Sequence, residues 1–76
     1  MDISKLTKRQ RVAILSFRNF LRPTYVQWMP KTMESMMLIG LTEATIYATG
    51  KTAFRLTDAG REVLAKIIEE ERGGKA

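Results

Sequence analysis

The tripeptide Gly50-Lys51-Thr52 comes closer to catalytic chemistry than any other short stretch of the sequence. These residue types end the phosphate-binding loop G-x-x-x-x-G-K-[ST], in which backbone N–H groups and the lysine hold nucleotide phosphates. That loop requires a glycine five residues before Gly50, where this chain has Thr45. It must also open a helix, whereas the residues after Thr52 alternate as in a strand. We therefore interpret Gly50-Lys51-Thr52 as the tip of a hairpin and exclude nucleotide hydrolysis.

The residue types on which most enzymes and metal sites depend are missing. The chain has no histidine and no cysteine. Their absence removes the commonest general base, the commonest zinc ligand and any disulfide. Catalysis would have to use carboxylates, lysines and hydroxyls alone. We therefore expect no enzymatic activity, with no catalytic residues, no cofactor and no bound metal.

The positive charge of the chain is unevenly distributed. The 76 residues carry a net charge of +5 at pH 7. Residues 1–60 contain nine Lys/Arg and four Asp/Glu, whereas residues 61–76 contain four of each. A positive field confined to the first three-quarters of the chain is expected if that part faces a polyanion such as nucleic acid. A basic protein without a polyanionic partner is the alternative.

Length and hydropathy predict one small domain. A chain of this size has a modest core, and no segment approaches the roughly 18 consecutive apolar residues of a membrane span. The N-terminus lacks the apolar core of a signal peptide. We expect residues 1–72 to form a single domain, residues 73–76 to be a disordered tail, and the protein to be cytoplasmic without membrane contact.

The first helix is predicted to begin after Thr7 and to end near Leu21, before Pro23. Thr7 and Gln10 have the spacing of a capping box, in which the two residues satisfy each other's backbone N–H groups. At helical spacing, one face of this segment is apolar. The residues of that face are Ala13, Ile14, Phe17, Phe20 and Leu21.

Two further helices are predicted before the hairpin. Residues 24–29, bounded by prolines, suit one or two helical turns, with Trp28 packed into the core. Pro30 is suited to the first position of the next helix, which runs over 31–39 and ends at Gly40. Its core face is expected to contain Met33, Met36 and Met37. Its outward side chains are Lys31, Thr32, Glu34, Ser35, Leu38 and Ile39.

Residues 43–56 predict a β-hairpin, because apolar and polar residues alternate on both sides of Gly50. A three-residue turn over 49–51, with Gly50 at positive φ, would pair Ile46 with Phe54. A last helix then starts at Thr57 or Asp58 as N-cap. Its apolar stripe is Gly60, Val63, Leu64, Ile67 and Ile68.

This order of elements, together with three sequence stretches, resembles the winged helix-turn-helix superfamily. LTKRQRVAIL at 6–15 is similar to the LT-x-x-Q-x-x-x-L opening of many such regulators. TMESMMLIGLTE at 32–43 is similar to their recognition helix and first wing strand. FRLTDAGREVL at 54–64 is similar to the strand-to-helix segment that closes the wing. The resemblance implies an α+β, mainly helical fold: three helices, a hairpin wing and a C-terminal helix.

The resemblance also implies a site for double-stranded DNA, as in a small stand-alone transcriptional regulator. Helix 31–39 would enter the major groove and the 43–56 hairpin would act as the wing. The expected contacts of the helix are Lys31, Thr32, Glu34 and Ser35. Those of the wing are Lys51, Thr52 and Arg55. Lys8, Arg9 and Arg11 are expected to contact phosphates. For each group, an exposed charged surface without a ligand is the alternative.

Leu38 and Ile39 favour a second interpretation, because two outward apolar residues can form a contact with a protein. They could join two copies of a DNA-binding dimer. They could instead belong to a winged-helix module that binds a partner protein and no DNA, since one fold hosts unrelated functions. So compact a module would suit a phage or a plasmid.

Overall fold

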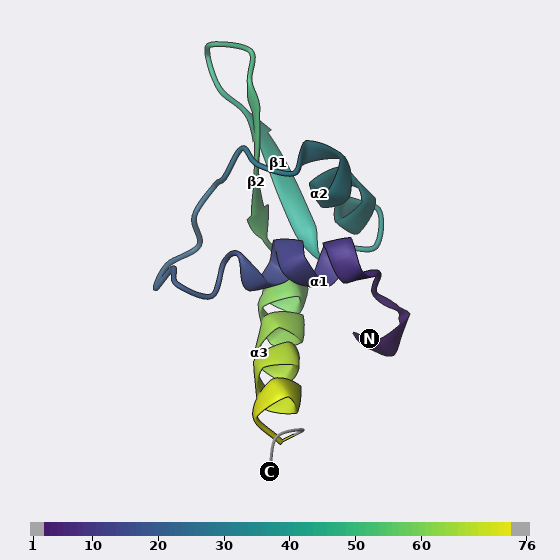
Figure 1. Ribbon diagram of the computed structural model, residues 1–76. Helices are drawn as coiled ribbons and strands as arrows, with labels where there is room; N and C mark the ends of the chain where they lie inside the picture. The colour runs from purple at the N-terminus through teal and green to yellow at the C-terminus, as the bar shows by residue number, and fades with distance from the viewer. Residues whose placement is uncertain (1–2, 74–76) are drawn as a thin grey trace.

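The chain has an α+β fold in the computed structural model, which describes residues 3–73 (Figure 1). Within these residues there are three α-helices, a short 3-10 turn and one antiparallel hairpin. In chain order they are η1 (Ile3–Lys5), α1 (Lys8–Leu15), α2 (Pro30–Met37), β1 (Thr42–Ile46), β2 (Thr52–Leu56) and α3 (Asp58–Gly73). The predicted tail lies outside the described residues apart from Gly73, the last residue of α3.

The start of α1 is confirmed and its predicted end is wrong. The Thr7 hydroxyl accepts from the backbone N–H of Gln10 at 3.1 Å, and the Gln10 side chain accepts from the N–H of Thr7 at 2.9 Å. The helix ends at Leu15, and residues 16–19 form tighter turns. Because the helical geometry stops there, Phe20 and Leu21 leave the core face, and Leu21 is 95% exposed.

The segment between α1 and α2 is extended, so the predicted helix over 24–29 is wrong. Val26 and Phe54 exchange backbone hydrogen bonds, with N···O distances of 2.7 and 2.8 Å. Strand β2 therefore lies between β1 and Val26. The β-branched and aromatic residues of the Thr24–Tyr25–Val26 stretch suit such an edge pairing better than a helix.

Trp28 is half-exposed rather than packed into the core. Its ring stacks on Phe20 with centroids 6.2 Å apart, and its Nε1–H donates to the Ser16 hydroxyl at 2.9 Å. The indole thus fastens the 20–28 segment to the end of α1. Its polar atom finds the partner that a partly buried indole N–H requires.

Helix α2 begins at Pro30, as predicted, and ends at Met37, two residues before the predicted end. Gly40 has φ +81°, and two backbone bonds close the helix: Gly40 N–H to Met37 O at 3.1 Å and Leu41 N–H to Met36 O at 2.9 Å. This is a Schellman end, which requires a residue in the left-handed region. Met36 is buried as predicted, whereas Met37 is 41% exposed, because the helix turns it toward the rim of the core.

The hairpin differs from the prediction by its register. Ala44 lies opposite Phe54, where Ile46 was predicted. The loop has the predicted three residues but comprises 48–50, closed by bonds between Tyr47 and both Gly50 and Lys51. Gly50 has φ +84°, as the turn chemistry predicts. A type I turn followed by a left-handed glycine is the usual three-residue hairpin.

The core lies where α1 packs against α2 and α3, with the hairpin base closing one side. The largest fully buried side chains come from the three α-helices, strand β2 and the turn before β1: Ile14, Met33, Met36, Leu41, Phe54 and Ile67. In α3, Gly60, Val63 and Ile67 are buried as predicted, and Leu64 and Ile68 are half-buried. No helix within residues 3–73 is long and apolar enough to cross a membrane.

Candidate nucleic-acid interface

The outer face of α2 carries Lys31, Glu34 and Leu38, which follow one another at helical spacing and are all exposed. Lys31 stands in the first turn, directly after Pro30. The helix has eight residues and is therefore about 12 Å long. A B-DNA major groove is of similar width, about 12 Å. A helix with its side chains is about 10 to 12 Å across, so α2 fits a groove of this width, with Lys31 in its first turn.

Thr32 and Ser35 lie on the flank of α2 that faces α1, and both are half-buried. The Ser35 hydroxyl donates to the Thr32 carbonyl at 2.6 Å and accepts from the Gln10 side-chain amide at 3.2 Å. These bonds hold the first turn of α1, with Lys8 and Arg9, beside α2. Ser35 is therefore already engaged within the protein.

The far end of the hairpin projects from the core. Ala53 and Phe54 are buried, whereas residues 46–52 are all exposed. Gly50 lies three positions before the buried Ala53, so the loop extends about 10 Å beyond the core. Figure 1 shows the loop as the outermost part of the molecule at that end. Lys51 and Thr52 stand on this projection, and both are exposed.

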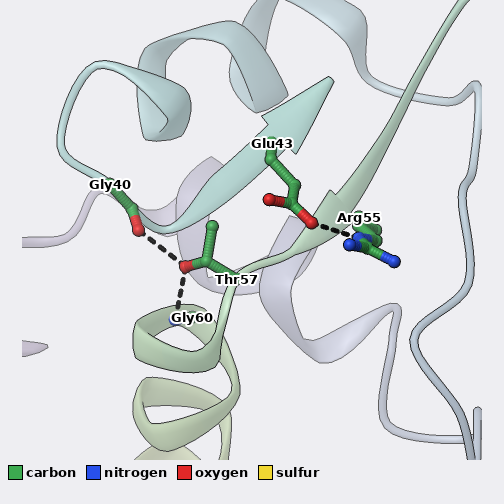
Figure 2. Close-up of polar contacts among 5 residues, drawn as sticks. All are labelled: Gly40, Glu43, Arg55, Thr57 and Gly60. Carbon is green, nitrogen blue, oxygen red and sulfur yellow. Dashed lines mark hydrogen bonds and ion pairs between the residues drawn. The ribbon is translucent and has the colours of Figure 1, made fainter. Parts of the chain in front are cut away.

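Arg55, by contrast, is engaged within the hairpin. Its Nε–H donates to a Glu43 carboxylate oxygen across the two strands (Figure 2). Its guanidinium also lies 5.0 Å from the centre of the Tyr25 ring. The hydrogen bond to Glu43 raises the pKa of the Arg55 guanidinium above its usual value. Arg55 thereby joins β1, β2 and the extended segment before α2.

Arg11 is engaged in a comparable way. One Nη donates to the Ile3 carbonyl at 2.9 Å, and the other lies 3.7 Å from a Glu70 carboxylate oxygen. The side chain therefore connects η1 and the far end of α3 to α1. Arg11 and Arg55 were predicted as phosphate and wing contacts, and the structure gives both an acidic partner of their own.

The remaining predicted basic residues have no such partner. Within residues 3–73, Lys8, Arg9, Lys31 and Lys51 form no ion pair. Helix α3 is the acidic part of the molecule, with five Asp/Glu and three Lys/Arg. Figure 1 shows α3 leaving the core on the side opposite the hairpin loop. The hairpin loop, α2 and the start of α1 carry these four basic residues, and we call this surface the basic end; α3 carries more acidic than basic residues.

A clasp at Thr57 fixes α2 relative to the hairpin and α3 (Figure 2). The Thr57 hydroxyl donates to the Gly40 carbonyl at 2.6 Å and accepts from the Gly60 N–H at 3.1 Å. The Thr57 N–H donates to the Leu41 carbonyl at 3.0 Å. The N-cap of α3 thus binds the turn that ends α2. This arrangement holds the outer face of α2 in a fixed orientation.

The apolar end of α2 is exposed as predicted. Leu38 is 86% exposed and Ile39 is 45% exposed. They adjoin Met37, which is also partly exposed, so three consecutive apolar residues meet solvent at the end of the helix. Clustered apolar exposure of this kind marks a contact with another protein more often than isolated apolar residues do.

Two features of the surface were not predicted from the sequence. Gln10 was assigned to a helix cap, but its amide also reaches Ser35 of α2. Ile46 is 73% exposed and Tyr47 is 42% exposed, so they offer apolar surface on the projecting loop. The exposure of Ile46 and Tyr47 could have been predicted from their closeness to Gly50 in the sequence, because residues next to a hairpin tip lie beyond the core.

No group of three or more acidic residues within 3–73 lies close enough together to hold a metal ion. The geometry therefore offers two arrangements: a basic end built on the hairpin loop and two helices, and an apolar end of α2. No protein-family model matches the chain, and no curated protein or solved structure is significantly similar to it.

Proposed function

We propose that the protein binds double-stranded DNA, with the outer face of α2 in the major groove and the hairpin loop against the adjacent backbone or minor groove. The observation that carries this proposal is a set of four basic residues that form no ion pair within residues 3–73: Lys8, Arg9, Lys31 and Lys51. Each can displace a counterion from a phosphate, and counterion release supplies much of the affinity for DNA.

The proposal assigns different roles to the predicted contacts. Lys31 and Glu34 would face base edges or phosphates, where a glutamate can accept from a cytosine amino group. Lys51 and Thr52 would contact the backbone or minor groove. Arg11 and Arg55 would act through their partners Glu70 and Glu43, by holding α1 and the hairpin in place.

The acidic helix α3 supports this orientation. Its surplus of acidic residues would be repelled by phosphates, and it leaves the core on the side away from the hairpin loop (Figure 1). A duplex docked at the basic end would meet the cations first. The uneven charge of the sequence thus corresponds to an uneven charge in space, which is the usual footprint of a DNA-binding module.

A titration across salt concentrations tests the proposal. Binding to a fluorescent 20-base-pair duplex is measured by anisotropy between low and moderate salt. Contacts from all four lysines and arginines give a slope of log K against log salt of about −3.6, since each phosphate contact contributes about 0.9. Lys31→Ala and Lys51→Ala each reduce the magnitude of the slope by about 0.9.

Two control variants sharpen this titration. Lys66→Ala removes a charge from α3 and leaves the slope unchanged. Arg55→Gln also leaves the slope unchanged, because the Arg55 guanidinium is bound to Glu43. Absence of binding at the lowest salt, or equal effects of Lys66→Ala and Lys51→Ala on the slope, would contradict the proposal.

A second function is favoured by the exposed side chains of Leu38 and Ile39. We propose, as the alternative, that this apolar end of α2 contacts another protein, a second copy of the chain being the simplest partner. Sedimentation equilibrium of the free protein measures its association, and Leu38→Ser should convert a dimer to a monomer. A dimer that Leu38→Ser leaves intact would place the contact elsewhere.

A further inference from the structure

An apolar cavity of about 200 Å³ lies between α3 and the segment that follows α1. It is distinct from the basic end of the molecule, and it is partly open to solvent. Its apolar walls are formed by Phe17, Phe20, Leu56, Leu64, Ala65 and Ile68. Phe17 and Leu56 belong to the core, so the floor of the cavity is the core itself.

Two arginines complete the lining, Arg22 from the segment after α1 and Arg61 from α3. Both are exposed, and within residues 3–73 neither forms an ion pair. No residue that lines the cavity is acidic. Asp58 and Glu43 line the neighbouring hollow beside Arg61, and Glu43 is bound to Arg55. Two arginines without an ion pair in the described residues therefore line an apolar cavity.

The segment that carries Arg22 is held in place from two directions. The Thr24 hydroxyl donates to the Arg22 carbonyl at 2.9 Å. On the other side, Phe20 packs edge-to-face on Phe17, with centroids 6.1 Å apart, and stacks on Trp28. These contacts hold the wall of the cavity in place, which lowers the ordering cost of binding a ligand there.

We propose that this cavity binds a small organic anion with an apolar body, its ring or chain against Phe17, Leu56 and Leu64 and its carboxylate toward Arg22 and Arg61. The size is sufficient, because an apolar cavity of about 150 Å³ holds benzene in another protein. Guanidinium groups bind carboxylates through paired, charge-assisted hydrogen bonds. The inference does not depend on DNA binding.

Benzoate and hexanoate are the probes, with benzyl alcohol and hexanol as neutral counterparts. Each is titrated into the ¹⁵N-labelled full chain and followed by NMR. The expected result is a dissociation constant for benzoate on the order of 1 mM, as suits a ligand of this size. The shifted amides should include Phe20, Thr24, Leu64 and Ala65. Benzyl alcohol should bind at least about twofold more weakly, because it lacks the charge.

Substitutions distinguish the contribution of the arginine charges to binding from that of the apolar cavity. Arg22→Gln and Arg61→Gln should each weaken benzoate about two- to fivefold and leave benzyl alcohol unchanged. Arg18→Gln, on the same segment but not in this cavity, should leave both unchanged. Ala65→Phe should fill the cavity and abolish binding of both, with circular dichroism and Tm checking that the variant folds.

Three results would overturn the proposal. One is no shift of the cavity amides at 20-fold the expected dissociation constant. The second is equal affinity for benzoate and benzyl alcohol. The third is unchanged benzoate affinity in both Arg22→Gln and Arg61→Gln, which remains decisive even if Ala65→Phe does not fold.

Discussion

Replacement of Gly60 by alanine tests how closely α3 approaches the turn that ends α2. A Cβ at position 60 would lie 2.1 Å from the Leu41 carbonyl oxygen, 3.1 Å from its carbonyl carbon and 3.1 Å from a Leu56 methyl. The first two atoms belong to the backbone, so no rotamer change relieves the overlap. The α3 N-terminus must move away from the turn, and this movement stretches the Thr57–Leu41 hydrogen bond.

The sign of the change in stability caused by Gly60→Ala distinguishes a close approach of α3 to the turn from an unobstructed helix. In an unobstructed helix, Gly→Ala stabilises by about 1 kcal/mol through helix propensity. Overpacking of this kind costs about 3 kcal/mol, and loss of one hydrogen bond adds about 1 kcal/mol. Gly60→Ala should therefore destabilise the protein by about 3 kcal/mol, which lowers Tm by more than about 10 °C in a domain of this size.

Thermal unfolding followed by circular dichroism, together with urea titration, measures this change. Gly73→Ala is the matched control, because the added Cβ there meets no atom within 4 Å. Its stability should stay the same or rise by less than about 1 kcal/mol. A Tm of Gly60→Ala equal to or above that of the wild type would refute the close approach of α3 to the Leu41 carbonyl.

Three smaller perturbations test other contacts. Thr57→Val removes the two hydroxyl bonds of the clasp and should cost about 1 to 2 kcal/mol in urea titration, whereas Thr57→Ser should retain most of the stability. Thr42→Val removes the buried hydroxyl that donates to the Met33 carbonyl at 2.7 Å and should cost about 1 kcal/mol; an unchanged midpoint would contradict that bond. Leu38→Ser should change the stability of the monomer by less than about 0.5 kcal/mol, whereas Leu41→Ser, at a buried position, should cost about 3 kcal/mol or more. Equal costs would show that Leu38 is not exposed.

Local chemistry was sufficient to predict the ends of several elements. The Thr7–Gln10 cap, Pro30 at a helix start, Gly40 as the stop after α2, Gly50 at positive φ and Thr57, one of the two N-cap candidates, are confirmed. Each depends on residues close together in the sequence. The alternation around Gly50 likewise predicted the hairpin, since its pattern is set by the two strands alone.

The errors come from contacts between distant residues. The helix predicted over 24–29 was displaced by pairing of Val26 with Phe54, 28 positions along the chain. Trp28 was predicted to lie in the core but instead stacks on Phe20. Phe20 can take part in this stack because α1 ends early, at Leu15. The register of the hairpin depends on which three residues form the turn. Residues 49–51 and 48–50 are nearly equivalent choices, and the wrong one was predicted.

The candidate site was predictable only in part for the same reason. Residue types and helical spacing indicated that Lys31, Glu34 and Leu38 would share an outer face. Spacing could not indicate that Arg11 and Arg55 have acidic partners, because Glu70 lies at the far end of α3 and the Glu43–Arg55 pair depends on strand register. The distinction between free and engaged cations comes from the tertiary structure.

NMR mapping of duplex DNA on the ¹⁵N-labelled protein tests the proposed DNA interface most directly. At low salt, the amides of residues 31–38 and 47–52 should shift or broaden as DNA is added. The amides of residues 61–72 in α3 should stay in place. Changes concentrated in α3, or an unchanged spectrum with DNA in excess, would contradict the assignment of α2 and the hairpin loop as a DNA-binding surface.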